Sequence, residues 1–288
     1  MANVVKGQSD IIYSNVKMNR FAFNPAAIEN NGAVNARLDV RQQWIGFPDA
    51  PSIQFLNVSD FFRNSNMGIS LTITNQTAGD EKQQLVKAGY TYHIFFKGGH
   101  QVNLGAGAGI LFRKLDYSNL SFEEDEEDIP LSDERKMLPD FEFGLEYKYK
   151  GFTAGFASNH ITTPDKKATI FKVPVQNHLY ASYLFVFNSG FSIEPGMAYH
   201  RGGPVSTFDF YTDIYIKDKI SAGLKYRTST SFIIRAGIKI SNTFEIDYAY
   251  DMGAGSMLNY NSGSHEILLI ARFSKKSSIL NTPRFIDD

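Results

Sequence analysis

The sequence contains no cysteine, which removes disulfide frameworks, thiolate metal sites and cysteine nucleophiles from consideration. It also lacks an excess of charge of either sign, because 29 basic residues face 30 acidic ones and the formal net charge is -1. A chain without a net positive field has no general attraction for nucleic acid or for an anionic membrane surface. We therefore expect no nucleic acid among its partners.

Long hydrophobic runs are missing as well. No stretch approaches the roughly 18 consecutive apolar residues that a membrane-spanning helix needs, so a helical membrane protein is excluded. The opening residues M-A-N-V-V-K-G-Q-S-D lack the apolar core of a signal peptide, and we infer a chain that is either cytoplasmic or given in processed form. Tryptophan occurs once, whereas tyrosine occurs 15 times, phenylalanine 24 times and glycine 23 times. This composition favours β-strands joined by tight turns.

Apolar and polar residues alternate with a period of two in most of the chain. Between Ala33 and Gln42, Val34, Leu38 and Val40 alternate with polar and charged residues, so a strand here has one apolar and one polar face. The pattern recurs in about fourteen segments between residues 33 and 273, most of them about nine to twelve residues long. A soluble β-sandwich hides such apolar faces in a core, whereas a membrane barrel turns them to lipid and its polar faces to a lumen.

The even strand count, the strand length and the connections favour the barrel. Five longer links (45–51, 75–82, 114–138, 161–174 and 252–264) fall on one side of the meander, and short turns fall on the other. The sequence thus predicts an all-β, transmembrane, up-and-down antiparallel β-barrel of about fourteen strands and of the outer-membrane type. We expect residues 1–32 to form an N-terminal periplasmic, plug-like segment, 33–273 the barrel, and 274–288 a C-terminal tail.

Charged residues of both signs fall on the polar faces, so charge pairs or a plug could cross the lumen.

Other groups of residues give no clear sign of a catalytic or ligand-binding site. The acidic run 123–134 could bind calcium or a partner, but without the D-x-D-x-D-G spacing a solvated surface loop is favoured. The G-A-G-A-G stretch at 105–109 alternates within a strand and thins one of its faces. The six histidines are scattered, and His265 follows no G-x-S-x-G turn. We expect no metal, no cofactor, no catalytic residue and no enzymatic activity.

Three stretches resemble a known family. The stretch R-Q-Q-W-I-G-F-P-D-A-P at 41–51 is similar to the R-x-Q-W-x-G-x-x-x-A-P signature of the PorP/SprF family of the type IX secretion system of Bacteroidota. The stretch F-N-P-A at 23–26 and the closing S-H-E-I-L-L-I-A-R-F at 264–273 resemble further parts of it. The resemblance marks Asn24, Pro25, Arg41, Gln42, Gln43, Trp44, Gly46, Pro48 and Pro51 as structural or partner-binding residues, and Phe273 as an insertion signal.

The resemblance implies an outer-membrane barrel of a Gram-negative bacterium that supports secretion or surface anchoring of a cargo protein, such as a gliding-motility adhesin with a type B C-terminal domain. It implies periplasmic or lipoprotein components of the type IX machinery, and outer-membrane lipid, as further partners. In this hypothesis the long loops and upper lumen hold the cargo, while the N-terminal segment and short turns face the machinery. Trp44 would anchor at the outer interface, Gly46 would relax the turn, and Pro48 and Pro51 would stiffen it. Alternatively, the motif only keeps the first corner of the barrel folded. At the level of function, the alternatives are a passive channel or solute transporter and a lipid hydrolase.

Overall fold

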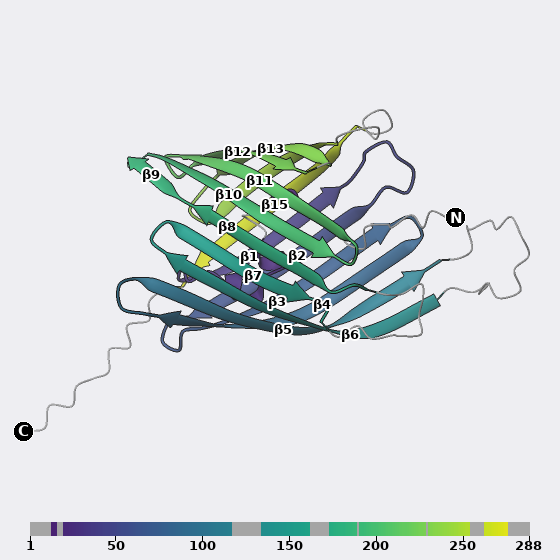
Figure 1. The fold of residues 1–288 in the computed structure, drawn as a ribbon, viewed down its shortest axis with the longest axis horizontal. Coiled ribbons are helices and arrows are strands. Elements are labelled where there is room, and N and C mark those ends of the chain that lie inside the picture. The colour runs from purple at the N-terminus through teal and green to yellow at the C-terminus, as the bar shows by residue number, and fades with distance from the viewer. Residues whose placement is uncertain are drawn as a thin grey trace, which may run out of the picture.

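The computed structural model describes residues 13–15, 20–116, 134–161, 173–188, 190–228, 230–253 and 262–275. They form one antiparallel sheet of tilted strands that curves round into a barrel (Figure 1). Its strands are β1 (Ala33–Gln42), β2 (Ser52–Phe62), β3 (Met67–Ala78), β4 (Glu81–Phe95), β5 (His100–Leu115), β6 (Glu134–Tyr149), β7 (Phe152–Asn159), β8 (Gln176–Tyr183), β9 (Phe185–Asn188), β10 (Phe191–Gly202), β11 (Val205–Ile216), β12 (Ile220–Arg227), β13 (Ser231–Lys239), β14 (Phe244–Gly253) and β15 (Ser264–Ser274).

The barrel closes because the last strand pairs with the first. Ala33 at the start of β1 lies opposite Ser274 at the end of β15, and the ladder continues to Gln42 opposite His265. Strands β8 and β9 occupy a single place in the ring, because both pair with β10 and only Leu184 separates them. The ring therefore has fourteen members, and the predicted closed, up-and-down barrel is confirmed. Over the described ranges, no helix is long and apolar enough to cross a bilayer.

The distribution of side chains is that of a membrane barrel. Along β1, Leu38 and Val40 on the outer face are 40 % and 44 % exposed, whereas Arg37 and Asp39 on the inner face are 1 % and 0 % exposed. Most other strands repeat this arrangement, with exposed Leu, Ile, Val and Phe outside and buried Asp, Glu, Arg, Lys and His inside, although β2, β13 and β15 also turn Phe55, Ile233 and Leu268 inward. A β-sandwich would bury the apolar face of each strand in its core, so the competing soluble fold is excluded.

The two ends of the barrel differ. The end that carries the turns after β2, β4, β6, β9, β11 and β13 is called the tight-turn end, and the opposite end the loop end. One predicted long link is wrong: the turn between β3 and β4 is only Gly79–Asp80, because Thr77 pairs with Lys82 and Ala78 with Glu81. The link predicted at 114–138 is shorter too, since β5 runs to Leu115 and β6 starts at Glu134.

These differences have one physical cause. Strands β5 and β6 have 16 residues each, more than the roughly 9–11 that a tilted strand needs to cross the hydrocarbon layer. Backbone pairing does not stop where the apolar residues stop, because polar side chains on both faces are compatible with a ladder in water. Alternating hydropathy marks the membrane belt, and the strands continue beyond it at the loop end.

Aromatic side chains gather on the outside of the tight-turn end. They are exposed and belong to β2, β9, β14 and β15 or directly follow β4: Phe62, Phe96, Phe187, Phe244 and Phe273. Phenylalanine at this level matches the interfacial aromatic belts of outer-membrane barrels. Phe273, the expected insertion signal, lies here with its ring edge on Phe244 at 6.4 Å, and its role in insertion stays a prediction.

Candidate functional site

Charged side chains of neighbouring strands pair across the inner wall, as the sequence suggested. Arg235 on β13 contacts Asp247 on β14 and Asp213 on β11, the latter at 2.9 Å. Lys87 on β4 reaches Glu142 on β6 across the glycines of β5. Buried charges are stable only with such partners, and each pair narrows the space inside the barrel.

A second layer inside the barrel is the N-terminal part of the chain. Residues 13–15 and 20–32 contact the inner wall and are called the lumenal segment. Tyr13 lies near Gln76 in the loop-end half, whereas Ile28 lies near Gly68 toward the tight-turn end, where Gly32 leads into β1. The expected division of the chain at residue 32 stays a prediction, but these contacts place the described part of the segment in the lumen.

Asn24 and Pro25 fix the middle of the lumenal segment. Asn24 caps the short 3-10 helix η2 (Pro25–Ala27), because its side-chain oxygen accepts the N–H of Ala26 at 2.9 Å. Its amide nitrogen donates to the carbonyl oxygen of Leu145 at 3.2 Å and to the hydroxyl of Tyr180 at 2.8 Å. Pro25 at the first helical position has no N–H to leave unsatisfied. The N-P pair therefore joins the segment to β6 and β8.

Two glycines of the wall make room for this contact. A Cβ atom on Gly105 would lie 2.3 Å from the backbone nitrogen of Ala26, and one on Gly144 would lie 2.0 Å from Asn24 Oδ1. The two glycines are directly opposite each other on β5 and β6. The missing side chain of Gly105 in the G-A-G-A-G stretch therefore leaves the space that the N-P-A turn occupies.

Phe23 anchors the same turn in an aromatic cluster. Its ring contacts Tyr180 at 5.9 Å, His178 at 4.8 Å and His200 at 5.7 Å, measured between ring centroids. The two histidines share a hydrogen bond between their Nδ1 atoms at 2.7 Å. Tyr180 in turn donates its hydroxyl to Glu146 at 2.5 Å. These contacts form a packed polar and aromatic core within the lumen.

Ion pairs fix the segment before and after the turn. Arg20 lies 3.5 Å from Glu146, and Glu29 lies 3.0 Å from Arg37 of β1, whose guanidinium stacks on Phe21 at 3.5 Å. Burial alone would raise the pKa of Glu29, but the charges of Arg37 and Arg20 outweigh it and hold that pKa below its ordinary value. Glu29 is therefore ionised and paired at neutral pH.

Arg41, the first residue of the predicted motif, faces the lumen and not the membrane. Its guanidinium contacts Asp251 at 2.7 Å, Glu266 at 3.3 Å and the hydroxyl of Ser14. The N–H groups of Ser14 and Asn15 donate to the same Glu266 carboxylate at 2.7 and 3.0 Å. Arg41 and Glu266 thus hold the loop-end part of the lumenal segment.

The remaining motif residues form the β1–β2 loop (43–51) at the loop end. Gln42, the last residue of β1, is exposed, and the N–H of Gln43 closes the loop on the carbonyl of Pro51 at 2.9 Å. Trp44 is half-buried with its ring edge on Phe47, and it and Gly46 both have positive φ angles, which makes glycine favourable at position 46. Pro48 is exposed and Pro51 half-buried.

Neighbouring elements hold this loop in place. The N–H of Ile45 donates to Gly263, and Ser262 donates back to Ile45, both at 2.8 Å. Ile45 and Phe47 nevertheless remain 37 % and 46 % exposed. The loop is therefore hydrogen-bonded to its neighbours and has an exposed apolar tip. Membrane anchoring by Trp44 stays a prediction, and the acidic run 123–134 lies outside the described residues apart from the backbone of Glu134.

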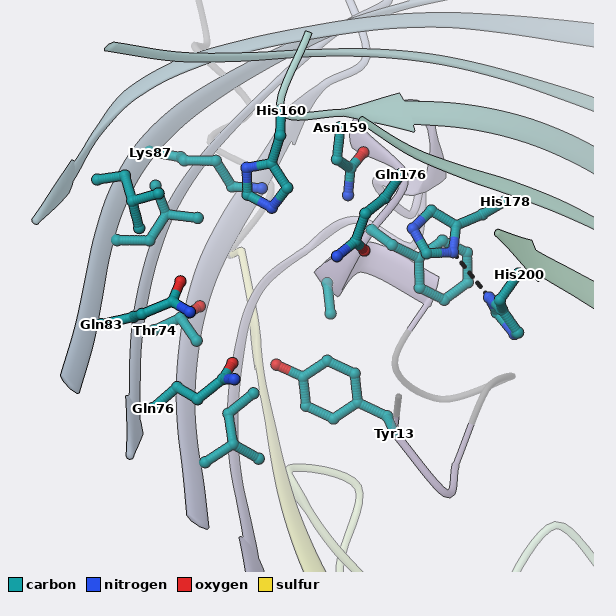
Figure 2. A pocket seen from close by; sticks show the side chains of 15 residues that line it. Tyr13, Thr74, Gln76, Gln83, Lys87, Asn159, His160, Gln176, His178 and His200 are labelled. Carbon is teal, nitrogen blue, oxygen red and sulfur yellow. Dashed lines mark hydrogen bonds between the residues drawn. The ribbon is translucent and has the colours of Figure 1, made fainter. Parts of the chain in front are cut away.

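A cavity of about 90 Å³ lies between the lumenal segment and the wall in the loop-end half (Figure 2). Figure 2 shows the ring of Tyr13 on one side and the His178–His200 pair on another, with Gln76, Gln83 and Gln176 around the space. Ile53, Leu85 and Leu111 provide an apolar part of its lining. This cavity is called the outer cavity.

Sequence reasoning missed several residues that bind the lumenal segment. Lys225 Nζ and Arg227 Nη2 donate to the carbonyl oxygen of Tyr13 at 3.2 and 2.9 Å, and both also pair with Asp209. Their inward parity was visible in the sequence. Their partner was not, since Tyr13 lies more than 200 residues away in an aperiodic stretch.

The apolar exterior, the closed ring and the polar, partly filled lumen together define an outer-membrane β-barrel. The type IX secretion system membrane protein PorP/SprF model matches residues 5–270, and the chain belongs to this family. It is accordingly an outer-membrane component of type IX secretion. Because barrels of this kind carry their short turns on the periplasmic side, we expect the tight-turn end to face the periplasm and the loop end the outside. The resemblance inferred from residues 23–26, 41–51 and 264–273 is confirmed.

Solved structures show the same kind of fold at low sequence identity. The CymD monoaromatic hydrocarbon channel is similar with a TM-score of 0.52 at 12 % identity, over 92 % of this chain and 94 % of that one. The outer membrane protein Omp33 of Acinetobacter baumannii has a TM-score of 0.49 at 8 % identity, over 85 % of this chain and 100 % of its own. No curated protein matches the sequence. At these identities the likeness to CymD speaks for the barrel alone.

Proposed function

We propose that this barrel binds a cargo protein at its loop end and supports the secretion or surface anchoring of that cargo. An adhesin with a type B C-terminal domain is the expected kind of cargo, and periplasmic or lipoprotein components of the type IX machinery are the expected partners at the tight-turn end. Family membership supports the setting. The observation that carries the proposal is that the lumen holds a polypeptide segment, bonded to both halves of the inner wall.

A lumen filled by polypeptide leaves little room for solutes to diffuse through, and the polypeptide in it supports the surrounding wall. The segment contacts β6 and β8 through Asn24, β12 through the Tyr13 carbonyl, and β15 through Ser14. These contacts pre-organise the loop end, where the β1–β2 loop presents the exposed Ile45 and Phe47. A rigid surface with apolar anchors suits protein recognition, because little ordering entropy is lost on binding.

The test is recovery of the barrel from its native outer membrane, with mass spectrometry of what stays bound. The matched variants are Phe47→Ser, which removes an apolar anchor of the loop tip, and Phe62→Ser, which removes an exposed phenylalanine at the tight-turn end. We expect a secreted protein to remain with the wild type and with Phe62→Ser, and to be depleted with Phe47→Ser. Recovery of the wild type with no secreted protein attached would contradict the proposal.

A passive channel is the second candidate, and one observation favours it. A cavity of about 280 Å³ at the tight-turn end is lined by charged residues that include Lys239, Glu245 and Arg272. Planar-bilayer recording separates the two candidates, because a channel gives large steady currents and a filled barrel does not.

We further propose that the protein is not an enzyme. The contacts of His265 support this, since its Nδ1 shares a hydrogen bond with the hydroxyl of Tyr248 at 2.5 Å and its ring is tilted by 50° against that of Tyr250. A lipase assay of the wild type and of His265→Ala checks it, and turnover that depends on His265 would overturn it.

A further inference from the structure

The first described residues of the lumenal segment are bound through their main chain. Lys225 Nζ and Arg227 Nη2 donate to the carbonyl oxygen of Tyr13. The carboxylate of Glu266 accepts the N–H groups of the next two residues at 2.7 and 3.0 Å. The side chains of those two residues add contacts with β1 and β14, the latter at 3.5 Å. The peptide group that follows Tyr13 is therefore held by the wall through both its oxygen and its nitrogen.

The middle of the same segment is held by contacts that select particular side chains. Asn24 uses its amide to cap η2 and to donate to the hydroxyl of Tyr180. Phe23 uses its ring, which packs on the rings of His178 and His200. The N-P-A turn is therefore an anchor that depends on its sequence. The residues before it are bound through a carbonyl and two N–H groups, which almost any polypeptide offers.

The charged groups that bind this main chain are also paired with one another. The two cations of β12 lie 3.1 and 2.8 Å from Asp209, and Arg41 lies 3.3 Å from Glu266. Removal of a partner from a buried charge is costly, because the charge is then left uncompensated. Exchange of one polypeptide for another at this place leaves each of these charges with a counter-charge. The arrangement can thus be vacated and refilled.

We propose that Lys225, Arg227 and Glu266 form a binding site for polypeptide main chain, and that residues 13–15 are its internal ligand, which a segment of the secreted cargo displaces. This group of three side chains is called the main-chain site. The inference rests on the proposed function and specifies how the cargo is held. The cargo offers one carbonyl followed by two N–H groups, so proline is excluded from the two residues that follow the carbonyl. The N-P-A turn stays in its place during the exchange.

The first test uses a synthetic peptide with the sequence of residues 11–16, I-I-Y-S-N-V, titrated against the full-length barrel in nanodiscs. Ser14→Pro and Asn15→Pro together remove both N–H groups of the internal ligand and leave the wall unchanged. We expect the peptide to bind this double variant at least about ten-fold more tightly than the wild type, because a hydrogen bond to a charged group contributes about ten- to one-hundred-fold. Methylation of the two corresponding peptide nitrogens should abolish the gain. Equal binding to both barrels, or equal binding of the methylated peptide, overturns the main-chain site.

A wall variant changes the affinity in the opposite direction. Glu266→Gln in the double-proline barrel removes the charge that accepts both N–H groups, and we expect peptide affinity to fall about ten-fold or more. Glu245→Gln is the matched control, because this inward carboxylate pairs with Arg272 at the tight-turn end. It should stay within about three-fold of the double-proline barrel. An equal loss in the two variants also overturns the main-chain site.

Displacement by cargo is measured with the terminal domain of the protein recovered with the wild-type barrel. Because the chain has no cysteine, Tyr13→Cys and Asn30→Cys each provide one site for a nitroxide label. We expect saturating cargo domain to raise the mobility of the label at position 13 and to leave the label at position 30, beyond the N-P-A turn, unchanged. A label at position 13 that stays immobile under bound cargo overturns the displacement and leaves the proposed function standing. Absence of any secreted protein on the wild type overturns the proposed function, and with it the cargo as the ligand.

Discussion

Replacing Gly105 by alanine tests whether the lumenal segment is packed onto the barrel wall. The added Cβ would lie 2.3 Å from the nitrogen of Ala26 and 2.5 Å from the carbonyl carbon of Pro25. Carbon atoms in contact are normally about 3.5–4.0 Å apart, so the η2 turn must retreat by about 1 Å or more. Because backbone atoms are struck, no side-chain rotation can relieve the overlap.

The cost can be estimated from the contacts that this shift disturbs. Overpacking of a tight interior costs about 1–3 kcal/mol. The bonds from Asn24 to Leu145 and from Asn103 to the carbonyl of Ala26 are then stretched, and each contributes about 1 kcal/mol. If stretching removes about half of each bond, Gly105→Ala lowers the free energy of unfolding by about 2–4 kcal/mol, within the additive limits of such sums.

Thermal unfolding of the detergent-purified barrel, followed by circular dichroism, measures this loss. Gly253→Ala is the matched control, because a Cβ there would meet nothing within 4 Å and removal of a glycine slightly stabilises a strand. Bilayer recording adds a second readout, since a displaced segment leaves a wider path. Equal melting temperatures and equal conductance for the two variants would refute the packed-segment reasoning.

Three further expectations follow from the same contacts. Arg41→Met should destabilise the barrel by about 3–5 kcal/mol in denaturant unfolding, because Asp251 and Glu266 lose their shared cation inside the lumen, and Arg41→Lys should recover part of this. The pKa of Glu29 is lowered in the folded protein, so the pairing of its carboxylate stabilises the protein fully above the ordinary pKa of 4.5. This stabilisation is lost as the pH falls through the lowered pKa of the folded state. The melting temperature of Glu29→Gln should therefore fall less steeply on acidification than that of the wild type. Wild-type barrels in planar bilayers should show no large steady current, and porin-like conductance would show that the segment leaves the lumen open.

The barrel could be predicted from sequence because its determinants are local and repeated. Alternation such as that of Val34, Leu38 and Val40 against polar or charged neighbours recurs in most strands, since each strand separately meets lipid outside and a mainly polar lumen inside. Strand ends were less visible. Pairs such as Thr77 with Lys82 continue the ladder where both faces are wet and the alternation has ended.

A plug-like N-terminal segment was predicted from the sequence, but the contacts of the lumenal segment with the wall were beyond the reach of pattern reasoning. The hydropathy of the segment shows no repeating pattern, because its backbone N–H and C=O groups bond to side chains of distant strands and not to a neighbouring strand. The N–H groups of Ser14 and Asn15, for example, donate to the carboxylate of Glu266. One signal was present in the sequence. Gly105 and Gly144 fall on the polar, inward parity, where a small residue leaves space for another piece of chain, and the N-P-A turn is the part that fills it.

The R-Q-Q-W motif lies between the lumenal segment and the exposed β1–β2 loop. Arg41 is the last inward-facing residue of β1 and contacts Ser14 in the lumen, while Trp44, three residues later, lies in the loop that carries the exposed Ile45 and Phe47. The same strand end therefore fixes the lumenal segment and the exposed loop relative to each other. This arrangement is compatible with both interpretations of the motif, which stay predictions, because a strand corner that keeps the barrel folded can also position the loop.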